Sequence, residues 1–208
     1  MFVKTLPYPE EARAIKLDYN GPRWTAPHEV QLLCWLSQHT HGAILELGCN
    51  EGRTLRELAL ANPGRHCIGV DYSGDSGMCR EQQAERPPID RIGFYAKDLG
   101  PLVSIHDQRS WEYLSHLRWP PLGFIFIDGN HSQSGVSQDT NAAVDYFRKR
   151  GGSGLIVWHD CYDNGPPWVK VKAVLAKLEN PIYWYADTCL AWTFVTATLW
   201  RKLLGGKR

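Results

Sequence analysis

The chain has 208 residues, with 23 lysines and arginines against 22 aspartates and glutamates, and a formal net charge of +1. This length is typical of one large domain with a substantial core. The balanced charge provides no general attraction for nucleic acid or for an anionic membrane surface, so neither is an expected partner. No stretch approaches the roughly 18 consecutive apolar residues of a membrane span.

The N-terminus and the cysteines favour a cytoplasmic protein. Prolines and glutamates interrupt MFVKTLPYPEEARAIKLDY (1–19), where a secretory signal would need a continuous apolar core. The six cysteines lie apart, several of them inside apolar runs, which is typical of reduced core thiols rather than of a disulfide framework or a zinc site. We expect an N-terminal extension over residues 1–25 and a single domain over residues 26–208.

Short apolar runs alternate with segments of helical length from residue 43 onward. The runs are AILEL (43–47), HCIGVD (66–71), RIGFYA (91–96), GFIFID (123–128) and GLIVWHD (154–160). Expected helices cover residues 27–37, 53–61, 77–84, 108–117, 135–150 and 168–178. Strands that are apolar on both faces and separated by helices are typical of a parallel sheet covered on both sides.

The end of the chain follows a different pattern. PIYWYA (181–186) and LAWTFVTATLW (190–200) are joined by only three residues, too few for a helical crossover, so we expect them to pair antiparallel. The predicted fold is therefore α/β, a three-layer sandwich with a mostly parallel seven-stranded sheet and a C-terminal antiparallel hairpin. In such a sheet, ligands bind beyond the carboxyl ends of the strands.

Two expected strands end in residues suited to a nucleoside ligand. ELGCNEG (46–52) forms a glycine turn that leads to a helix N-terminus, and Asp71 closes the next strand, where its carboxylate could accept two ribose hydrogen bonds. A dinucleotide loop would read G-x-G-x-x-G, but Asn50 stands where the second glycine is needed. Glu46, two residues before Gly48, suits a cationic sulfonium better than a diphosphate.

With Ala-Lys-Asp-Leu (96–99) after the third expected strand, these features in this order resemble the S-adenosylmethionine site of class I methyltransferases, whose fold is Rossmann-like. The resemblance covers about residues 26–200. It implies that the loop 46–52 surrounds the methionine part of the cofactor, Asp71 holds the ribose, and Asp98 meets the adenine amino group with Leu99 alongside. The implied cofactor-binding residues are Glu46, Gly48, Asn50, Gly52, Asp71, Tyr72, Ser73, Asp98, Leu99 and Asp128.

Asp-Gly in FIFIDGNHSQSG (124–135) is also a hairpin signal, but the next apolar run begins only near residue 155, which favours a parallel crossover. The segment 126–162 instead resembles small-molecule O-methyltransferases that modify macrolides and cephalosporins. That resemblance implies Asp128 and Asp160 as ligands of a divalent metal such as Mg²⁺, and His131 as the base. A hard cation held by two carboxylates lowers the pKa of a bound hydroxyl, and a nearby imidazole takes the proton.

Relatives often place a second oxygen ligand beside the last acid, whereas His159 and Cys161 flank Asp160 here. Nitrogen or sulfur at that place weakens the case for Mg²⁺ or favours a softer ion, with His159 as a third ligand. On the following helix, Asp139 and Asp145 are expected on a solvated face. Aromatic residues from Tyr162 to Trp168 could line a pocket for a ring-shaped acceptor.

The predicted activity is methyl transfer from S-adenosylmethionine to a hydroxyl of a small molecule, such as a sugar, a phenol or a natural product. Two alternatives stay open: a methyltransferase acting on RNA or protein, and a cofactor-binding homologue without turnover. Balanced charge and the lack of an Asn/Asp-Pro-Pro-aromatic motif count against the first. A homodimer could form through the apolar segment 30–36 or the aromatic C-terminal strand.

Overall fold

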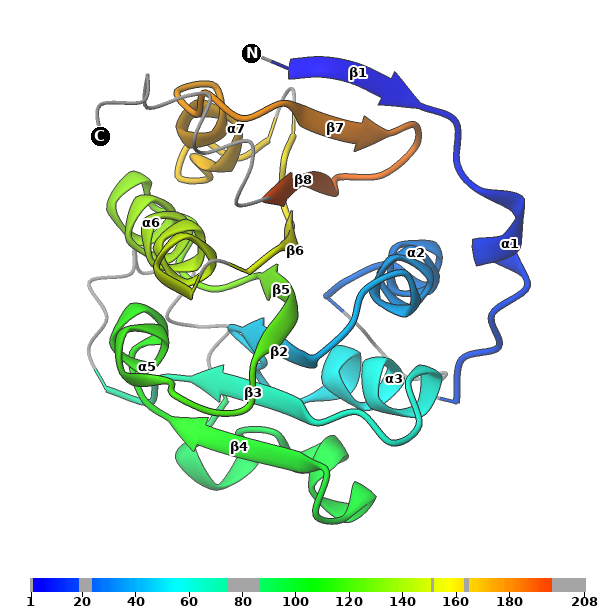
Figure 1. The fold of residues 1–208 in the computed structure, drawn as a ribbon, viewed down its shortest axis with the longest axis vertical. Helices are drawn as coiled ribbons and strands as arrows, with labels where there is room; N and C mark the ends of the chain where they lie inside the picture. The colour runs from blue at the N-terminus through cyan, green and yellow to red at the C-terminus, as the bar shows by residue number, and fades with distance from the viewer. Residues whose placement is uncertain (1, 19–23, 75–86, 151, 163–164, 196–208) are drawn as a thin grey trace.

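The computed structural model describes residues 2–18, 24–74, 87–150, 152–162 and 165–195. A central sheet separates two helical layers, with α2 and α3 on one face and α5, α6 and α7 on the other (Figure 1). The helices are α1 (Glu10–Arg13), α2 (Pro27–Gln38), α3 (Arg53–Ala61), α5 (Ser110–His116), α6 (Gln133–Arg150) and α7 (Val171–Leu175), with the 3₁₀ helices η1 (Ile89–Arg91) and η2 (Phe94–Leu99).

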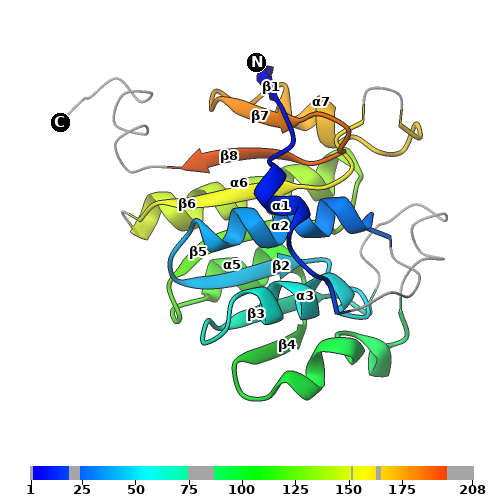
Figure 2. The ribbon, with the colours of Figure 1, turned by 90° about the vertical axis from the view of Figure 1, so that its right-hand side faces the viewer.

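The sheet has eight strands in the order β1-β7-β8-β6-β5-β2-β3-β4 (Figure 2). They are β1 (Phe2–Leu6), β2 (Ala43–Leu47), β3 (Cys67–Asp71), β4 (Val103–Asp107), β5 (Leu122–Ile127), β6 (Gly154–Trp158), β7 (Ile182–Tyr185) and β8 (Ala191–Val195). Strand β8 runs antiparallel to both β6 and β7, and the other pairs are parallel. The predicted α/β class, Rossmann-like layering and closing hairpin are therefore confirmed.

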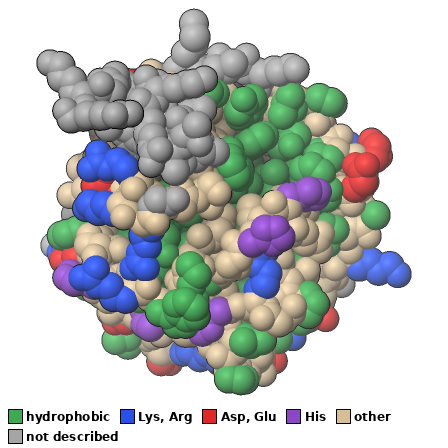
Figure 3. Space-filling model, in the orientation of Figure 1, with side chains coloured by type: hydrophobic (Ala, Val, Ile, Leu, Met, Phe, Trp, Pro, Cys, Tyr) green, Lys and Arg blue, Asp and Glu red, His purple; other side chains and the backbone are tan. Residues whose placement is uncertain are grey.

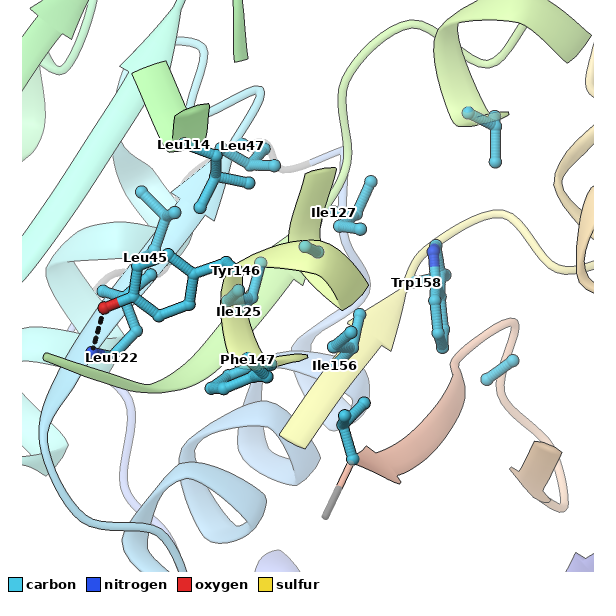
Figure 4. Packing of buried hydrophobic residues seen from close by; sticks show 14 of the residues in the cluster. Leu45, Leu47, Leu114, Leu122, Ile125, Ile127, Tyr146, Phe147, Ile156 and Trp158 are labelled. Atoms are coloured by element: carbon cyan, nitrogen blue, oxygen red, sulfur yellow. Dashed lines mark hydrogen bonds between the residues drawn. The ribbon is translucent and has the colours of Figure 1, made fainter. Parts of the chain in front are cut away.

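Alternation along the strands divides the core between the two faces. Leu45, Ile125 and Ile156 belong to the cluster that contacts α5, α6 and α7, whereas Phe124 and Val157 face α2 and α3. Figure 4 shows the first cluster, in which the Tyr146 hydroxyl on α6 accepts a hydrogen bond of 3.0 Å from the backbone N–H of Leu122. Both faces of the central strands are buried, as the continuous apolar runs predict.

The prediction of a third strand over residues 91–96 is wrong. This segment forms parts of η1 and η2, and the strand is β4, ten or so residues later. Gly93 adopts a left-handed φ of 65°, and its N–H donates to the Asn50 carbonyl at 2.8 Å, so the segment closes over the loop after β2. Strand β4 lies at the sheet edge with half-buried residues, which explains its weaker apolar signal.

Other boundaries agree more closely, and α3 begins and ends where the sequence predicts. Strand β1 adds an eighth strand beside β7, from the segment expected as an N-terminal extension. The apolar residues of segment 30–36, expected as a possible dimer surface, pack into the core of this chain on α2, where Leu32 and Leu33 are fully buried. The homodimer itself stays a prediction. The expected helix 77–84 and residues 196–200 lie outside the described residues.

Candidate active site

Two glycines in the turn after β2 allow its backbone to pack closely against neighbouring segments. Gly48 has a φ of 88°, and a Cβ there would lie 2.2 Å from the Asp128 carbonyl oxygen, so only glycine lets the ends of β2 and β5 come together. Gly52 has a φ of 82° at the start of α3 and lies against Gly93, where a Cβ would come 2.8 Å from the Gly93 Cα. Both glycines position the loop, and Gly48 also lines the cavity beside it.

Asp71, at the end of β3, holds this loop in place. Its carboxylate accepts hydrogen bonds from the backbone N–H groups of Asn50 at 2.6 Å and Tyr72 at 2.7 Å. Asp71 and Asn50 line a cavity of about 320 Å³, and Tyr72 lines a smaller one of about 50 Å³. Ser73 is exposed and binds Asp107 through its backbone N–H and its hydroxyl, so it closes the edge of β3 and β4 instead.

Glu46 is buried at the end of β2 and points toward the side of the sheet covered by α2 and α3. Burial, together with the charges of Asp128 and Asp71, raises the pKa of its carboxyl well above the ordinary value. Its Oε2 has no hydrogen-bond partner among the described residues, and the side chain lines a small cavity with Asn50 and Asp128. A buried acceptor without a partner at this place fits a ligand that donates hydrogen bonds or carries positive charge.

The ends of β5 and β6 bring four predicted residues together. Ile127 and Trp158 are register partners, so Asp128 and His159, one residue further along each strand, lie side by side. His159 Nδ1 is 3.0 Å from Asp128 Oδ1 and 3.4 Å from Asp160 Oδ1. His131 Nε2 is 3.1 Å from Asp160 Oδ2 and 3.4 Å from Asp128 Oδ1.

The opposite charges of these carboxylates and imidazoles shift the pKa values of both. Burial raises the pKa of Asp128, but the charges and hydrogen bonds of His159 and His131 outweigh burial and hold that pKa well below its usual range. Burial likewise lowers the pKa of His131, yet the hydrogen bond and charge of Asp128 leave it raised. The pKa of His159 also ends well above its ordinary value, because Asp128 outweighs the effect of burial.

Glu29 on α2 faces the other side of the His159 ring, a contact that the sequence did not predict. Its Oε2 is 3.4 Å from His159 Nε2, and its Oε1 accepts hydrogen bonds from the Cys189 N–H at 2.6 Å and Sγ at 3.0 Å. Burial opposes ionisation of Glu29, but the hydrogen bonds from His159 and Cys189 and the charge of His159 lower its pKa to about 2. The cluster thus extends from the cavity into the protein interior.

A cavity of about 320 Å³ opens above these residues. Trp168 stacks on the His131 ring with centroids 6.1 Å apart, so the predicted loop does line the cavity. Trp24, which is 70% exposed, also lines the cavity, and no motif in the sequence connects it with this site. The cavity is lined by Trp24, Gly48, Asn50, Asp71, Pro87, Asp128, Gly129, His131, His159, Asp160, Tyr162, Pro166, Trp168 and Val169.

Asp98 and Leu99 lie elsewhere, at the end of η2. The Asp98 carboxylate pairs with Arg56 at 2.7 Å, is 69% exposed, and does not line the cavities that contain Gly48. Their role at the adenine was inferred from the strand 91–96, which the structure replaces with β4. The adenine contact stays a prediction that has lost this structural basis.

A second cavity of about 50 Å³ is lined by residues of α5 and α6 and by Gly48, Asp71 and Gly129, which also line the large cavity. Asp139 lines it and is only 4% exposed, so the prediction of a solvated face is wrong for this residue. Burial raises the pKa of Asp139 to about 7. Asp145 does lie at the surface, where it pairs with Arg148 and Lys149.

The donor atoms around Asp128 also fit a divalent cation. Asp128, His131 and Asp160 each offer a ligand atom within 4.8 Å of the others, and Glu29, His159 and Cys189 form a second such group. Metal–ligand bonds of about 2.0–2.2 Å place neighbouring ligand atoms roughly 3.0–3.4 Å apart. The measured separations of His159 Nδ1 from Asp128 and Asp160, 3.0 and 3.4 Å, lie within this range.

Comparison with solved structures identifies the fold. The S-adenosylhomocysteine-bound methyltransferase PaMTH1 of Podospora anserina has a TM-score of 0.58 at 14% identity, covering 82% of this chain and 78% of its own. A candidate caffeoyl-CoA O-methyltransferase from Staphylococcus aureus gives 0.58 at 14%, covering 84% and 85%. The O-methyltransferase TomG of Streptomyces achromogenes, solved with S-adenosylmethionine, gives 0.55 at 16%, covering 82% and 81%.

The fold is that of class I S-adenosylmethionine-dependent methyltransferases. Residues 45–161 match the sequence profile of a family of methyltransferase domains, and the chain belongs to this family. Among curated proteins, none matches the sequence of this chain. None of the helices in the described part of the chain combines the length and apolar character needed to span a bilayer.

Proposed function

We propose that this protein methylates a hydroxyl oxygen of a small molecule at the cavity above Asp128, with a divalent cation assisting. The observation that carries the proposal is that Asp128, His131 and Asp160 line one cavity together with Gly48, Asn50 and Asp71. One cavity therefore joins the loops expected to hold the cofactor to the groups that handle a proton. Transfer between two bound molecules requires this adjacency.

S-adenosylmethionine, when bound, supplies a methyl carbon activated by the sulfonium charge. Asp71 and the backbone around Asn50 would fix its ribose, and Glu46 would meet its positive charge. Among these residues, Glu46 has a buried oxygen without a partner in the described part of the chain, which supports a cationic ligand.

The chain's remaining task is to hold the acceptor and remove its proton. Asp128 and Asp160 would bind the cation, which would lower the pKa of the acceptor hydroxyl and offset the carboxylate charges that raise the pKa of His131, so that its Nε2 is unprotonated. His131 Nε2 would then receive the hydroxyl proton as the oxygen bonds to the methyl carbon and the S–CH₃ bond breaks, with S-adenosylhomocysteine as the leaving group. Trp168 fixes the His131 ring by stacking and forms part of the acceptor wall. Aromatic walls at Trp24 and Trp168 favour an acceptor with a flat or ring-shaped body.

The first test is calorimetric titration of the protein with S-adenosylmethionine, for which we expect micromolar to sub-millimolar affinity. A panel of phenols, catechols and sugars would then be assayed for methylated product with and without EDTA. His131→Gln should lower kcat about 100-fold or more, as expected for loss of a general base, while cofactor affinity stays unchanged. Absence of cofactor binding at millimolar concentration contradicts the proposal, and product only with RNA or protein redirects it to another acceptor.

A further inference from the structure

His159 lies between carboxylates from two separate parts of the fold. It continues the alternation of β6 beyond Val157 and therefore points toward the α2 face of the sheet. On one side, Nδ1 is 3.0 Å from Asp128 and 3.4 Å from Asp160. On the other side, Nε2 is 3.4 Å from Glu29, which is 130 residues away in sequence. Each ring nitrogen thus faces a different carboxylate environment.

The Glu29 carboxylate is held firmly by three hydrogen-bond donors. The backbone N–H and the thiol of Cys189 donate to Oε1, and the Ala26 N–H donates to Oε2 at 3.2 Å. Glu29 is only 4% exposed, and Pro27 at the start of α2 fixes the helix turn that carries it. These contacts leave its Oε2 as a fixed acceptor directed at the His159 ring.

An acceptor at Nε2 determines what the other nitrogen can do. Nε2 must carry a proton to donate to Glu29. In the metal-free protein Nδ1 also carries a proton and donates to Asp128 at 3.0 Å, because, despite burial, the surrounding carboxylates raise the pKa of His159. A divalent cation would displace this Nδ1 proton, and the ring would then offer its Nδ1 lone pair to the cation beside Asp128 and Asp160. Carboxylate, histidine and metal arranged in this order are a recurring outer-shell pattern in metal sites.

We propose that Glu29 is a positioning residue that orients His159 so that Nδ1, Asp128 and Asp160 together bind a first-row transition-metal ion, such as Mn²⁺, Co²⁺ or Zn²⁺, in preference to Mg²⁺. An imidazole nitrogen among the ligands favours these ions, because Mg²⁺ prefers an all-oxygen set. His131 then remains beside the cation as the proton acceptor. This inference rests on the proposed function, since it assigns the cation of the same site.

The direct test titrates the full chain, freed of metal by a chelator, with Mn²⁺, Co²⁺, Zn²⁺ and Mg²⁺ in the calorimeter without cofactor or acceptor. We expect the three transition ions to bind at least about 100-fold more tightly than Mg²⁺. Co²⁺ should also develop visible absorption bands that report its ligands. Mg²⁺ binding as tight as Co²⁺ overturns the preference, and no binding of any ion leaves His159 as a charged bridge between Asp128 and Glu29 and overturns the proposal.

Substitutions distinguish a role of Glu29 in orienting His159 from a general role in folding. Glu29→Gln should weaken Co²⁺ binding about 10- to 100-fold and shift its spectrum, as outer-shell changes do. Glu57→Gln is the matched control, because Glu57 is buried to 3% exposure on α3 and accepts a hydrogen bond from the backbone N–H of Asp18. It should leave Co²⁺ affinity unchanged. Equal affinity for Co²⁺ in Glu29→Gln and the wild type would remove Glu29 from the proposal.

His159→Asp provides an independent reading, because it converts the ligand set to three carboxylates. The preference for Co²⁺ over Mg²⁺ should fall at least about tenfold in this variant. An unchanged preference contradicts the role of the imidazole. Each variant is also titrated with S-adenosylmethionine: cofactor binding without metal binding defeats this inference alone, whereas loss of both in the wild type defeats the proposed function.

Discussion

The large cavity and the small cavity are each lined by an aspartate, half-buried Asp128 in the first and buried Asp139 in the second, and Gly129 lines both. In the large cavity, imidazoles of His131 and His159 surround Asp128, and its pKa falls well below the usual range despite burial. In the small cavity, burial alone raises the pKa of Asp139 to about 7. At neutral pH the aspartate in the large cavity is therefore ionised, whereas the aspartate in the small cavity is close to half protonated, because the two have different neighbours.

The largest effect is expected when the charged aspartate loses its charge. Asp128→Asn leaves His159 and His131 without their main counter-charge, and breaking a buried pair in this way typically costs about 3–5 kcal/mol. We expect the free energy of unfolding to fall by about this amount at pH 7 in the presence of EDTA, measured by denaturation with urea.

The pH dependence gives the control for Asp128. A carboxyl with a lowered folded-state pKa stabilises the protein above its unfolded value of 3.8, and that contribution disappears as the pH falls through the folded value. The difference between Asp128→Asn and the wild type should therefore be constant from pH 5 to about pH 6. Above 6.5, the unfolded value of the imidazoles, the difference should shrink, because the stability that Asp128 provides by raising the pKa values of His131 and His159 is lost as the pH rises through their folded values. Equal stabilities at pH 7 would show that Asp128 and the imidazoles do not form a stabilising group.

In the small cavity, we expect the charge of Asp139 to lower the free energy of unfolding rather than raise it. The native protein holds the Asp139 proton up to about pH 7, whereas the unfolded chain releases it near 3.8, so the native state loses stability as the pH rises between these values. The shift corresponds to at most about 4 kcal/mol at pH 8. Asp139→Asn should therefore stabilise the protein by about 2 kcal/mol at pH 8 and by progressively less toward pH 4.

Thermal unfolding of Asp139→Asn and the wild type over pH 4–8 measures this slope. Asp145→Asn, six residues after Asp139 on α6 and at the surface, is the control and should show no comparable pH dependence. A wild-type slope that persists in Asp139→Asn would assign it to another group.

The sequence predicted the central sheet well, because β2, β5 and β6 are continuous apolar runs buried on both faces. It also predicted which residues meet at the β5 and β6 ends, since neighbouring parallel strands finish at one edge. It failed at β4, where an edge strand carries a weak signal, while Gly93 broke the stronger run before it.

The residues that sequence reasoning missed depend on tertiary contacts. Glu29 stands at the third position of α2, where a glutamate is adequately explained as a cap for the helix, and nothing local connects it with His159. Asp139 did leave a signal: Val136 and Ala143, three and four residues away, place it on the buried face of α6. The acid was assigned to the surface on its polarity alone.

Asp98 is an exposed aspartate, unlike Asp128 and Asp139, and we expect its substitution to have the smallest effect. Its pair with Arg56 is at the surface, where ion pairs contribute little to stability. We expect Asp98→Asn to change neither the free energy of unfolding beyond experimental error nor the affinity for S-adenosylmethionine beyond about twofold. Urea denaturation and calorimetric titration measure the two quantities.

The result for Asp98→Asn is to be compared with that for Asp71→Asn, because Asp71 lines the cavity and holds the loop at Asn50. The affinity of Asp71→Asn for the cofactor should fall at least about tenfold, because each hydrogen bond to a charged carboxylate contributes about 1.5–3 kcal/mol to binding. If Asp98→Asn weakened binding as much as Asp71→Asn, the adenine would have to reach η2, and η2 would have to move from its packing against the loop after β2.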